Sequence, residues 1–155
     1  MGLGSNLENP IEQVKKALQA LKLLPNTHLK TQSALYRSRP LGEQNQPDYI
    51  NAVAMLVTEL SPLILLDNLQ AIENKQGRIR GAERWGPRTL DLDMLLYDNL
   101  QWQEARLILP HSGLYERAFV LYPLYDCSPD LILPNGQAVS VLMRGFDGLE
   151  KVTNN

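Results

Sequence analysis

The spacing of apolar residues predicts two amphipathic helices in the first half of the chain. Each begins at a proline, Pro10 or Pro62, that follows a residue able to cap a helix. The apolar positions after each proline recur at intervals of three or four residues. They are Ile11, Val14, Leu18 and Leu21 in the first helix, and Leu65, Leu66, Leu69 and Ile72 in the second. We expect the first helix to end near Pro25 and the second to stop at Gly77.

Strict alternation of apolar and polar residues predicts strands between and after these helices. The segments are 28–36, 49–59 and 90–96, with a polar loop at 38–47 between the first two. Residues 1–3 form at most the stub of a further strand, and Gly4-Ser5-Asn6 reads as a tight turn. The resulting order, β-α-β-β-α-β, predicts an α+β, ferredoxin-like domain with a mostly antiparallel sheet and helices packed on it.

The pattern weakens after Asn99, where we expect a C-terminal extension of short elements. It predicts a short strand at 106–110, a short helix at 119–125, a turn at 134–136 and one or two helical turns at 139–143. No repeat or linker divides the chain, so we expect one domain over residues 1–155.

The segment from Gly77 to Tyr97 combines a basic, glycine-rich loop with an acidic strand. Asp91 and Asp93 alternate with leucines, so both carboxylates share one face of the strand, roughly 7 Å apart. A divalent cation such as Mg²⁺ would relieve their repulsion and bind phosphate oxygens with its other sites. The preceding arginines could grip the same phosphates. They are Arg78, Arg80, Arg84 and Arg88. The segment therefore suggests metal-assisted phosphoryl transfer, with a surface ion-pair array or an RNA contact as alternatives.

Composition narrows the class of protein but not its chemistry. The chain is 44% hydrophobic and 21% charged, with a formal net charge of −2, which argues against general binding of polyanions. A single cysteine, Cys127, cannot form an intrachain disulfide and fits a reducing compartment. No apolar run reaches membrane-spanning length. We expect a cytoplasmic, monomeric protein that contacts neither membrane nor nucleic acid.

Five short motifs, in the same order along the chain, resemble the 6-hydroxymethyl-7,8-dihydropterin pyrophosphokinase family. They are GSNL at 4–7, YRS at 36–38 with PLG at 40–42, QPDYIN at 46–51, ERWGPRTLDLD at 83–93 and PH at 110–111. The resemblance covers essentially the whole chain. It implies an enzyme of folate biosynthesis that transfers pyrophosphate from ATP to a pterin alcohol.

The resemblance also implies roles for individual residues. Asp91 and Asp93 would bind two Mg²⁺ ions that bridge the triphosphate of ATP, while Arg78, Arg88 and Trp85 would close over the substrates. Positions expected to contact the nucleotide are Gln70, Glu73, Arg80, Arg84, Arg106, His111 and Arg117. Positions expected to bind the pterin are Ser38, Leu41, Tyr49, Asn51 and Phe119. The pterin ring would stack between Tyr49 and Phe119.

Three features depart from the family pattern. Arg39 and Ser112 stand at positions where other residues are usual. Members of the family also usually carry several apolar residues before the GSNL segment, where this chain has three residues in all. We therefore expect a shortened first strand and a weakened sheet, or a start that lies further upstream.

Two other functions compete with this interpretation. A nucleotide-sugar transferase also uses a D-x-D motif, but the chain is short for such an enzyme. A ferredoxin-like RNA-binding module would need a basic sheet face with exposed aromatic residues, and the acidic strand has the wrong sign.

Overall fold

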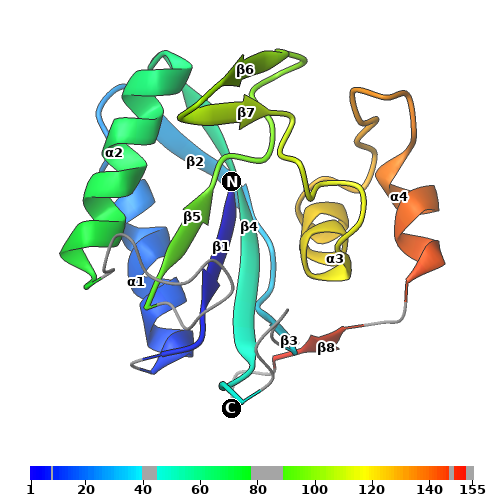
Figure 1. Ribbon diagram of the computed structural model, residues 1–155, viewed down its shortest axis with the longest axis horizontal. Helices are drawn as coiled ribbons and strands as arrows, with labels where there is room; N and C mark the ends of the chain where they lie inside the picture. The colour runs from blue at the N-terminus through cyan, green and yellow to red at the C-terminus, as the bar shows by residue number, and fades with distance from the viewer. Residues whose placement is uncertain (8, 40–44, 78–88, 147–148, 153–155) are drawn as a thin grey trace.

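The computed structural model describes the chain except for residues 8, 40–44, 78–88, 147–148 and 153–155 (Figure 1). The helices are α1 (Pro10–Leu21), α2 (Pro62–Lys75), α3 (Ala118–Cys127), α4 (Val139–Leu142) and the 3₁₀ turn η1 (Met143–Gly145). The strands are β1 (Gly2–Ser5), β2 (Thr27–Gln32), β3 (Tyr36–Ser38), β4 (Tyr49–Thr58), β5 (Asp91–Asp93), β6 (Trp102–Glu104), β7 (Leu107–Leu109) and β8 (Glu150–Lys151). Among these described elements, no helix is long and apolar enough to cross a membrane.

The main sheet has the predicted ferredoxin-like topology. Its strand order is β5-β1-β4-β3-β8, with β2 also pairing with β4, and every one of these pairings is antiparallel. The two helices α1 and α2 connect its strands in the expected order, each starting at its proline. The prediction of an α+β domain with this core is confirmed.

The first strand corrects the predicted turn at Gly4-Ser5-Asn6. Gly4 and Ser5 belong to β1 and pair with Asn51 and Ile50 of β4. β1 also pairs with β5 on its other side, so it is the central strand of this part of the sheet (Figure 1). Pairing on both sides overrides the turn preference that the glycine and serine suggest.

The prediction of one continuous strand at 28–36 is wrong. The segment forms two strands, β2 and β3, with a break between them. At the break, the Ser33 amide donates to the Val53 carbonyl of β4, and the Val53 amide donates to the Ser33 hydroxyl, each at 2.9 Å. The serine side chain thus replaces a backbone acceptor and lets the strand change course. The strand predicted at 90–96 is also shorter, since β5 contains only three residues.

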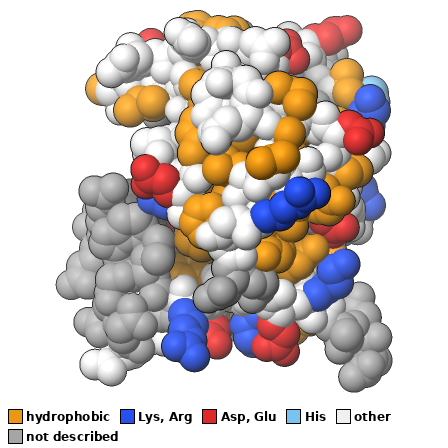
Figure 2. Space-filling model, turned by 90° about the vertical axis from the view of Figure 1, so that its right-hand side faces the viewer, with side chains coloured by type: hydrophobic (Ala, Val, Ile, Leu, Met, Phe, Trp, Pro, Cys, Tyr) orange, Lys and Arg blue, Asp and Glu red, His pale blue; other side chains and the backbone are white. Residues whose placement is uncertain are grey.

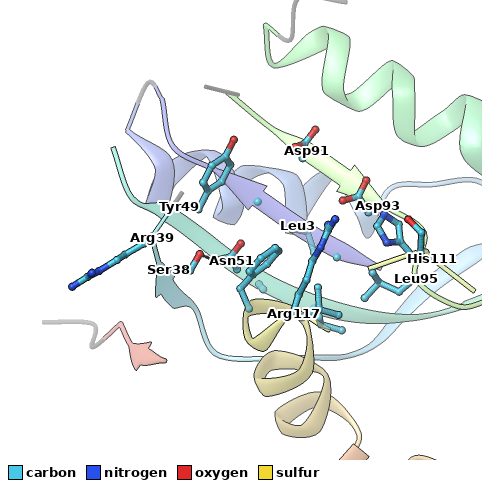
Figure 3. A pocket seen from close by; sticks show the side chains of 17 residues that line it. Leu3, Ser38, Arg39, Tyr49, Asn51, Asp91, Asp93, Leu95, His111 and Arg117 are labelled. Atoms are coloured by element: carbon cyan, nitrogen blue, oxygen red, sulfur yellow. Dashed lines mark hydrogen bonds between the residues drawn. The ribbon is translucent and has the colours of Figure 1, made fainter. Parts of the chain in front are cut away.

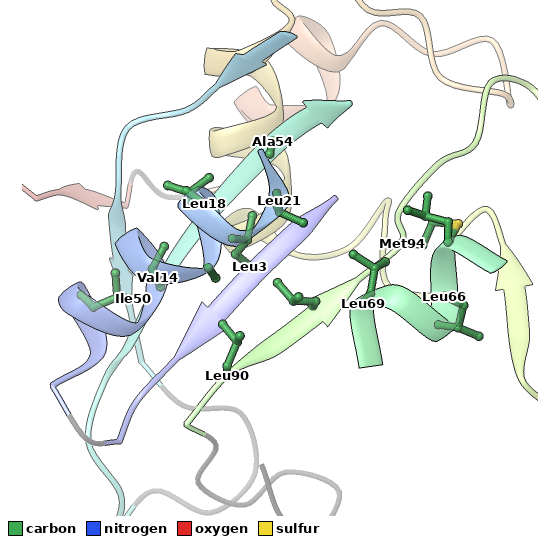
Figure 4. Packing of buried hydrophobic residues seen from close by; sticks show 14 of the residues in the cluster. Leu3, Val14, Leu18, Leu21, Ile50, Ala54, Leu66, Leu69, Leu90 and Met94 are labelled. Carbon is green, nitrogen blue, oxygen red and sulfur yellow. The ribbon is translucent and has the colours of Figure 1, made fainter. Parts of the chain in front are cut away.

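Helices cover both faces of the sheet. On one face, α1 and α2 bury a core that includes Leu21, Leu69 and Leu90, none of which has exposed surface (Figure 4). On the other face, α3 packs against β4 around a second core that includes Leu114 and Leu121. The predicted C-terminal extension therefore supplies the helical layer that covers this second face.

Within that extension, two strands escaped prediction. β6 forms an antiparallel hairpin with β7, and β8 pairs with β3 at the edge of the main sheet. The other short elements lie close to the predicted segments, including the turn at Gly136, whose φ is 87°.

We predict that Ser33→Ala lowers the free energy of unfolding by about 1–3 kcal/mol, because it leaves the buried Val53 amide without its acceptor. Urea denaturation measures the change. The control is Ser61→Ala, since Ser61 is exposed and its side chain does not cap α2, and its effect should stay within about 0.5 kcal/mol. Equal unfolding midpoints for the two variants would contradict this account of the strand break.

Candidate functional site

Most of the predicted site residues that the structure describes meet in one cavity of about 300 Å³ (Figure 3). Its floor is the β4-β1-β5 part of the sheet, and one wall is the segment that leads from β7 into α3. The predicted residues that line it are Ser38, Tyr49, Asn51, Asp91, Asp93, His111, Arg117 and Phe119. Arg39 and Ser112, the two departures from the family pattern, line it as well.

Two glycines of β1 keep the middle of the floor open. Gly4 stands opposite Asn51 of β4 on one side and opposite Asp91 of β5 on the other, and Gly2 stands opposite Asp93. Leu3, between them, is buried in the core below. A Cβ at Gly4 would lie 3.5 Å from the Asn51 Oδ1 atom. Because neither glycine has a side chain, Asn51 and the two aspartates face a common space across β1.

Asp91 and Asp93 come to this space from the same face of β5, as their spacing predicts. Asp91 is partly exposed, Asp93 is exposed, and Leu92 between them is buried. In the described part of the chain, no group of three or more His, Cys, Asp or Glu side chains could hold a metal ion. Two accessible carboxylates fit Mg²⁺, which commonly takes one or two protein carboxylates and completes its shell with water and phosphate oxygens.

Glu73, expected to contact the nucleotide, lies on the opposite side of β5. It is 2% exposed, and its Oε2 atom accepts a 2.8 Å hydrogen bond from the Leu92 amide. This bond ties α2 to the D-x-D strand from below. Gln70 and Arg106 lie together elsewhere, with the Arg106 Nη2 atom 3.3 Å from the Gln70 Oε1 atom. The structure brings none of these three to the lining of the cavity.

On the other side of the floor lies the buried Asn51 amide, whose orientation is fixed by a hydrogen bond. The Asn51 Nδ2 atom donates to the Ser38 hydroxyl at 2.7 Å, and both side chains are buried. This hydrogen bond leaves the Asn51 carbonyl oxygen on the side of Gly4, next to Tyr49. A planar heterocycle with N–H donors suits an oriented amide oxygen beside aromatic rings.

His111 is held in one tautomer by a backbone amide. The Gly113 N–H donates to the His111 Nδ1 atom at 3.0 Å, so a neutral ring carries its proton on Nε2. Burial lowers the pKa of His111 below its usual 6.5, and the nearby Arg117 cation lowers it further, while Asp91 opposes both effects. The Arg117 guanidinium also lies over the Phe119 ring, 5.7 Å from its centroid. The wall of the cavity therefore presents a neutral N–H donor beside a permanent cation.

The remaining predicted site residues lie outside the described part of the chain. They are Leu41, Arg78, Arg80, Arg84, Trp85 and Arg88. Sequence reasoning in turn missed Gly2 and Gly4 as the floor of the cavity. Their alternation with the buried Leu3 was the signal that could have found them.

We predict that the pKa of His111 lies below 6.5 in the protein without substrates, and that Arg117→Ala raises it by removing the neighbouring cation. Asp91→Asn should lower it further. An NMR titration of ¹⁵N-histidine-labelled protein measures these values, and His28→Gln assigns the signals because the chain has two histidines. A pKa unaffected by Arg117→Ala would contradict the proximity of the two groups.

The known proteins that this chain resembles have names that refer to pterin pyrophosphokinase activity or to folic acid synthesis. The chain is 56% identical over 146 residues to a 2-amino-4-hydroxy-6-hydroxymethyldihydropteridine pyrophosphokinase of Haemophilus influenzae, covering 94% of this chain and 91% of that protein. A protein of the same name from Pseudomonas aeruginosa is 51% identical over 154 residues, covering 98% and 94%. Folic acid synthesis protein fol1 of Schizosaccharomyces pombe is 39% identical over 134 residues, which cover 86% of this chain and 18% of that longer protein.

The sequence model of one family matches residues 1–129, a range that includes all the strands of the cavity floor. Together with the near full-length similarity to the two bacterial proteins, this match shows that the chain belongs to the 7,8-dihydro-6-hydroxymethylpterin-pyrophosphokinase (HPPK) family.

Proposed function

We propose that this protein transfers pyrophosphate from ATP to the hydroxymethyl group of 6-hydroxymethyl-7,8-dihydropterin, releasing AMP and the pterin pyrophosphate. The observation that carries the proposal is the cavity itself, where two carboxylates and an oriented, buried amide share one open floor. The names of the bacterial relatives describe this reaction, and the name of fol1 connects it with folic acid synthesis.

The pterin occupies the Asn51 side of the cavity. Asn51 accepts a hydrogen bond from the heterocycle, and its bond to Ser38 prevents the amide from turning over. The ring stacks between Tyr49 and Phe119, which line the same cavity. Discrimination against other flat molecules follows, because a ring without a matching donor would leave the buried amide oxygen unsatisfied.

The triphosphate occupies the side of Asp91 and Asp93, together with two Mg²⁺ ions. When bound, Mg²⁺ neutralises phosphate charge and makes the phosphorus more electrophilic. Two carboxylates on the protein and three phosphates on the nucleotide are a donor set of the kind that this ion prefers. The Leu92–Glu73 hydrogen bond keeps the strand that carries both carboxylates in place.

Transfer of pyrophosphate with release of AMP requires attack on the β-phosphorus. The pterin hydroxyl oxygen forms a bond to this phosphorus, and the bond to the α,β-bridging oxygen breaks as AMP leaves. The hydroxyl proton passes to solvent water. Negative charge develops on the bridging oxygen and the departing α-phosphate. The Nε2–H of His111 and the Arg117 guanidinium donate hydrogen bonds to these oxygens. We propose the same role for Arg78 and Arg88, and closure over the substrates for Trp85.

The two alternative functions are less well supported. Among the described residues on the face in Figure 2, the basic side chains stand apart from one another, interspersed with acidic, apolar and uncharged surface, whereas RNA binding would favour a continuous basic field. A nucleotide-sugar transferase could use the D-x-D strand, but the family match and the pterin-related names of the relatives give it no support.

We predict that Asp91→Asn and Asp93→Asn each reduce kcat by a factor on the order of 10²–10³, because each removes a metal-binding charge while keeping the side-chain shape. The assay measures AMP released from ATP and the pterin alcohol in Mg²⁺. Pterin affinity, measured by calorimetry, should change little, since the pterin contacts Asn51 on the other side of the floor.

Asp98→Asn is the matched control, because Asp98 is exposed outside the cavity and its φ of 51° suits asparagine. This variant should keep normal turnover. Wild-type protein that released no AMP would overturn the proposed function, and active Asp91 or Asp93 variants would overturn the metal assignment alone.

A further inference from the structure

The wall segment between β7 and α3 has a backbone that is anchored at several points. The His111 amide donates to the Leu95 carbonyl at 2.9 Å, and the Leu114 amide donates to the His111 carbonyl at 3.1 Å. Leu114 itself has no exposed surface and belongs to the core under α3. A group added to this segment therefore cannot be accommodated by moving the backbone outward without disturbing buried contacts.

Gly113 lies in the middle of this segment, directly under the Arg117 side chain. A Cβ atom at Gly113 would stand 2.4 Å from both the Cζ and Nε atoms of Arg117 and 2.8 Å from its Cδ atom. These separations are far shorter than any van der Waals contact. The present course of the Arg117 side chain is thus compatible with glycine and with no other residue at position 113.

The backbone conformation does not explain why glycine stands at position 113. Gly77 and Gly136 have positive φ values, which glycine adopts easily, but Gly113 does not. Alanine at position 113 would therefore not face the strain of a positive φ. What alanine could not do is leave room for the guanidinium, which here lies over the Phe119 ring at the edge of the cavity.

Gly113 also orients His111, the second hydrogen-bond donor on this wall. Its N–H fixes the His111 ring through Nδ1 and so directs the Nε2–H away from the backbone. One small residue thus sets the positions of both His111 and Arg117, through its amide and through its missing side chain respectively.

We propose that Gly113 is a positioning residue for the nucleotide phosphates, acting through Arg117 and His111. This inference rests on the proposed function, in which these two side chains meet the triphosphate. If Gly113 only relieved crowding, its replacement would not change nucleotide binding. Arg117 would adopt another rotamer, and the protein would bind nucleotide as before.

The test separates the two ways in which Gly113 acts. Gly113→Ala keeps the N–H and adds a Cβ, so it displaces Arg117 while leaving the His111 hydrogen bond. The matched control is Gly145→Ala, since a Cβ at Gly145 would meet nothing within 4 Å and its φ is not positive. Both variants, Arg117→Ala and the double variant Gly113→Ala/Arg117→Ala are titrated with Mg²⁺ and α,β-methylene-ATP, whose α–β linkage cannot be cleaved.

We expect Gly113→Ala and Arg117→Ala each to weaken binding of α,β-methylene-ATP on the order of tenfold, the usual size for loss of a hydrogen bond to a charged group. The double variant should bind no more weakly than Arg117→Ala, because the added Cβ has no guanidinium left to displace. Gly145→Ala should bind normally. In Gly113→Ala, the melting temperature and the pterin affinity should stay at wild-type values, and the ring ¹⁵N shifts of neutral His111 should still show its proton on Nε2.

Two results would overturn the positioning role: normal nucleotide binding by Gly113→Ala, or losses that add in full in the double variant. Failure of the proposed function gives a different result, in which the wild type binds α,β-methylene-ATP but releases no AMP from ATP and the pterin alcohol. In that case, the comparison of nucleotide binding by the single and double variants still decides the role of Gly113. A wild type that did not bind the nucleotide at all would overturn both.

Discussion

The pairing of β1 between β4 and β5 is the constraint on which the cavity depends. Gly4 is opposite Asn51 on one side and Asp91 on the other, so the register of two strand pairs decides which side chains share the floor. A slip of one residue in either pair would turn the corresponding polar group into the core. The glycines matter as much as the register, because side chains at positions 2 and 4 would occupy the space that both substrates need in the proposed reaction.

The opposite face of the same strands supplies the rigidity. Leu3, Leu92 and Leu90 are buried against α1 and α2, and the Glu73 carboxylate accepts the hydrogen bond of the Leu92 amide between the two aspartates. The acidic strand is therefore fixed from the core side. Preorganisation of this kind lowers the reorganisation required in the transition state. α3 and the segment before it then add a second, cationic wall on the open face.

The sequence predicted those features that depend on local pattern. Alternation placed Asp91 and Asp93 on one face, and the prolines located both main helices. It failed where a tertiary contact decides the structure. Gly4 and Ser5 suggest a turn until the pairing of β1 on both sides is known, and the break at Ser33 depends on the Val53 amide, far away in the chain. Gly113 gave no signal in the sequence, because its importance lies in the path of Arg117, four residues further on.

The proposed function requires that a divalent ion bind at Asp91 and Asp93, on the floor formed with β1. Mn²⁺ replaces Mg²⁺ in many phosphate sites and broadens the NMR signals of nearby nuclei. In a titration of ¹⁵N-labelled protein with Mn²⁺ and α,β-methylene-ATP, we expect the signals of the Gly2 and Gly4 amides to broaden first, since these residues pair with the aspartates. The amides of α4, which Figure 1 shows beyond α3, should remain sharp. Broadening centred away from β1 and β5, or the same pattern in Asp91→Asn, would contradict this requirement.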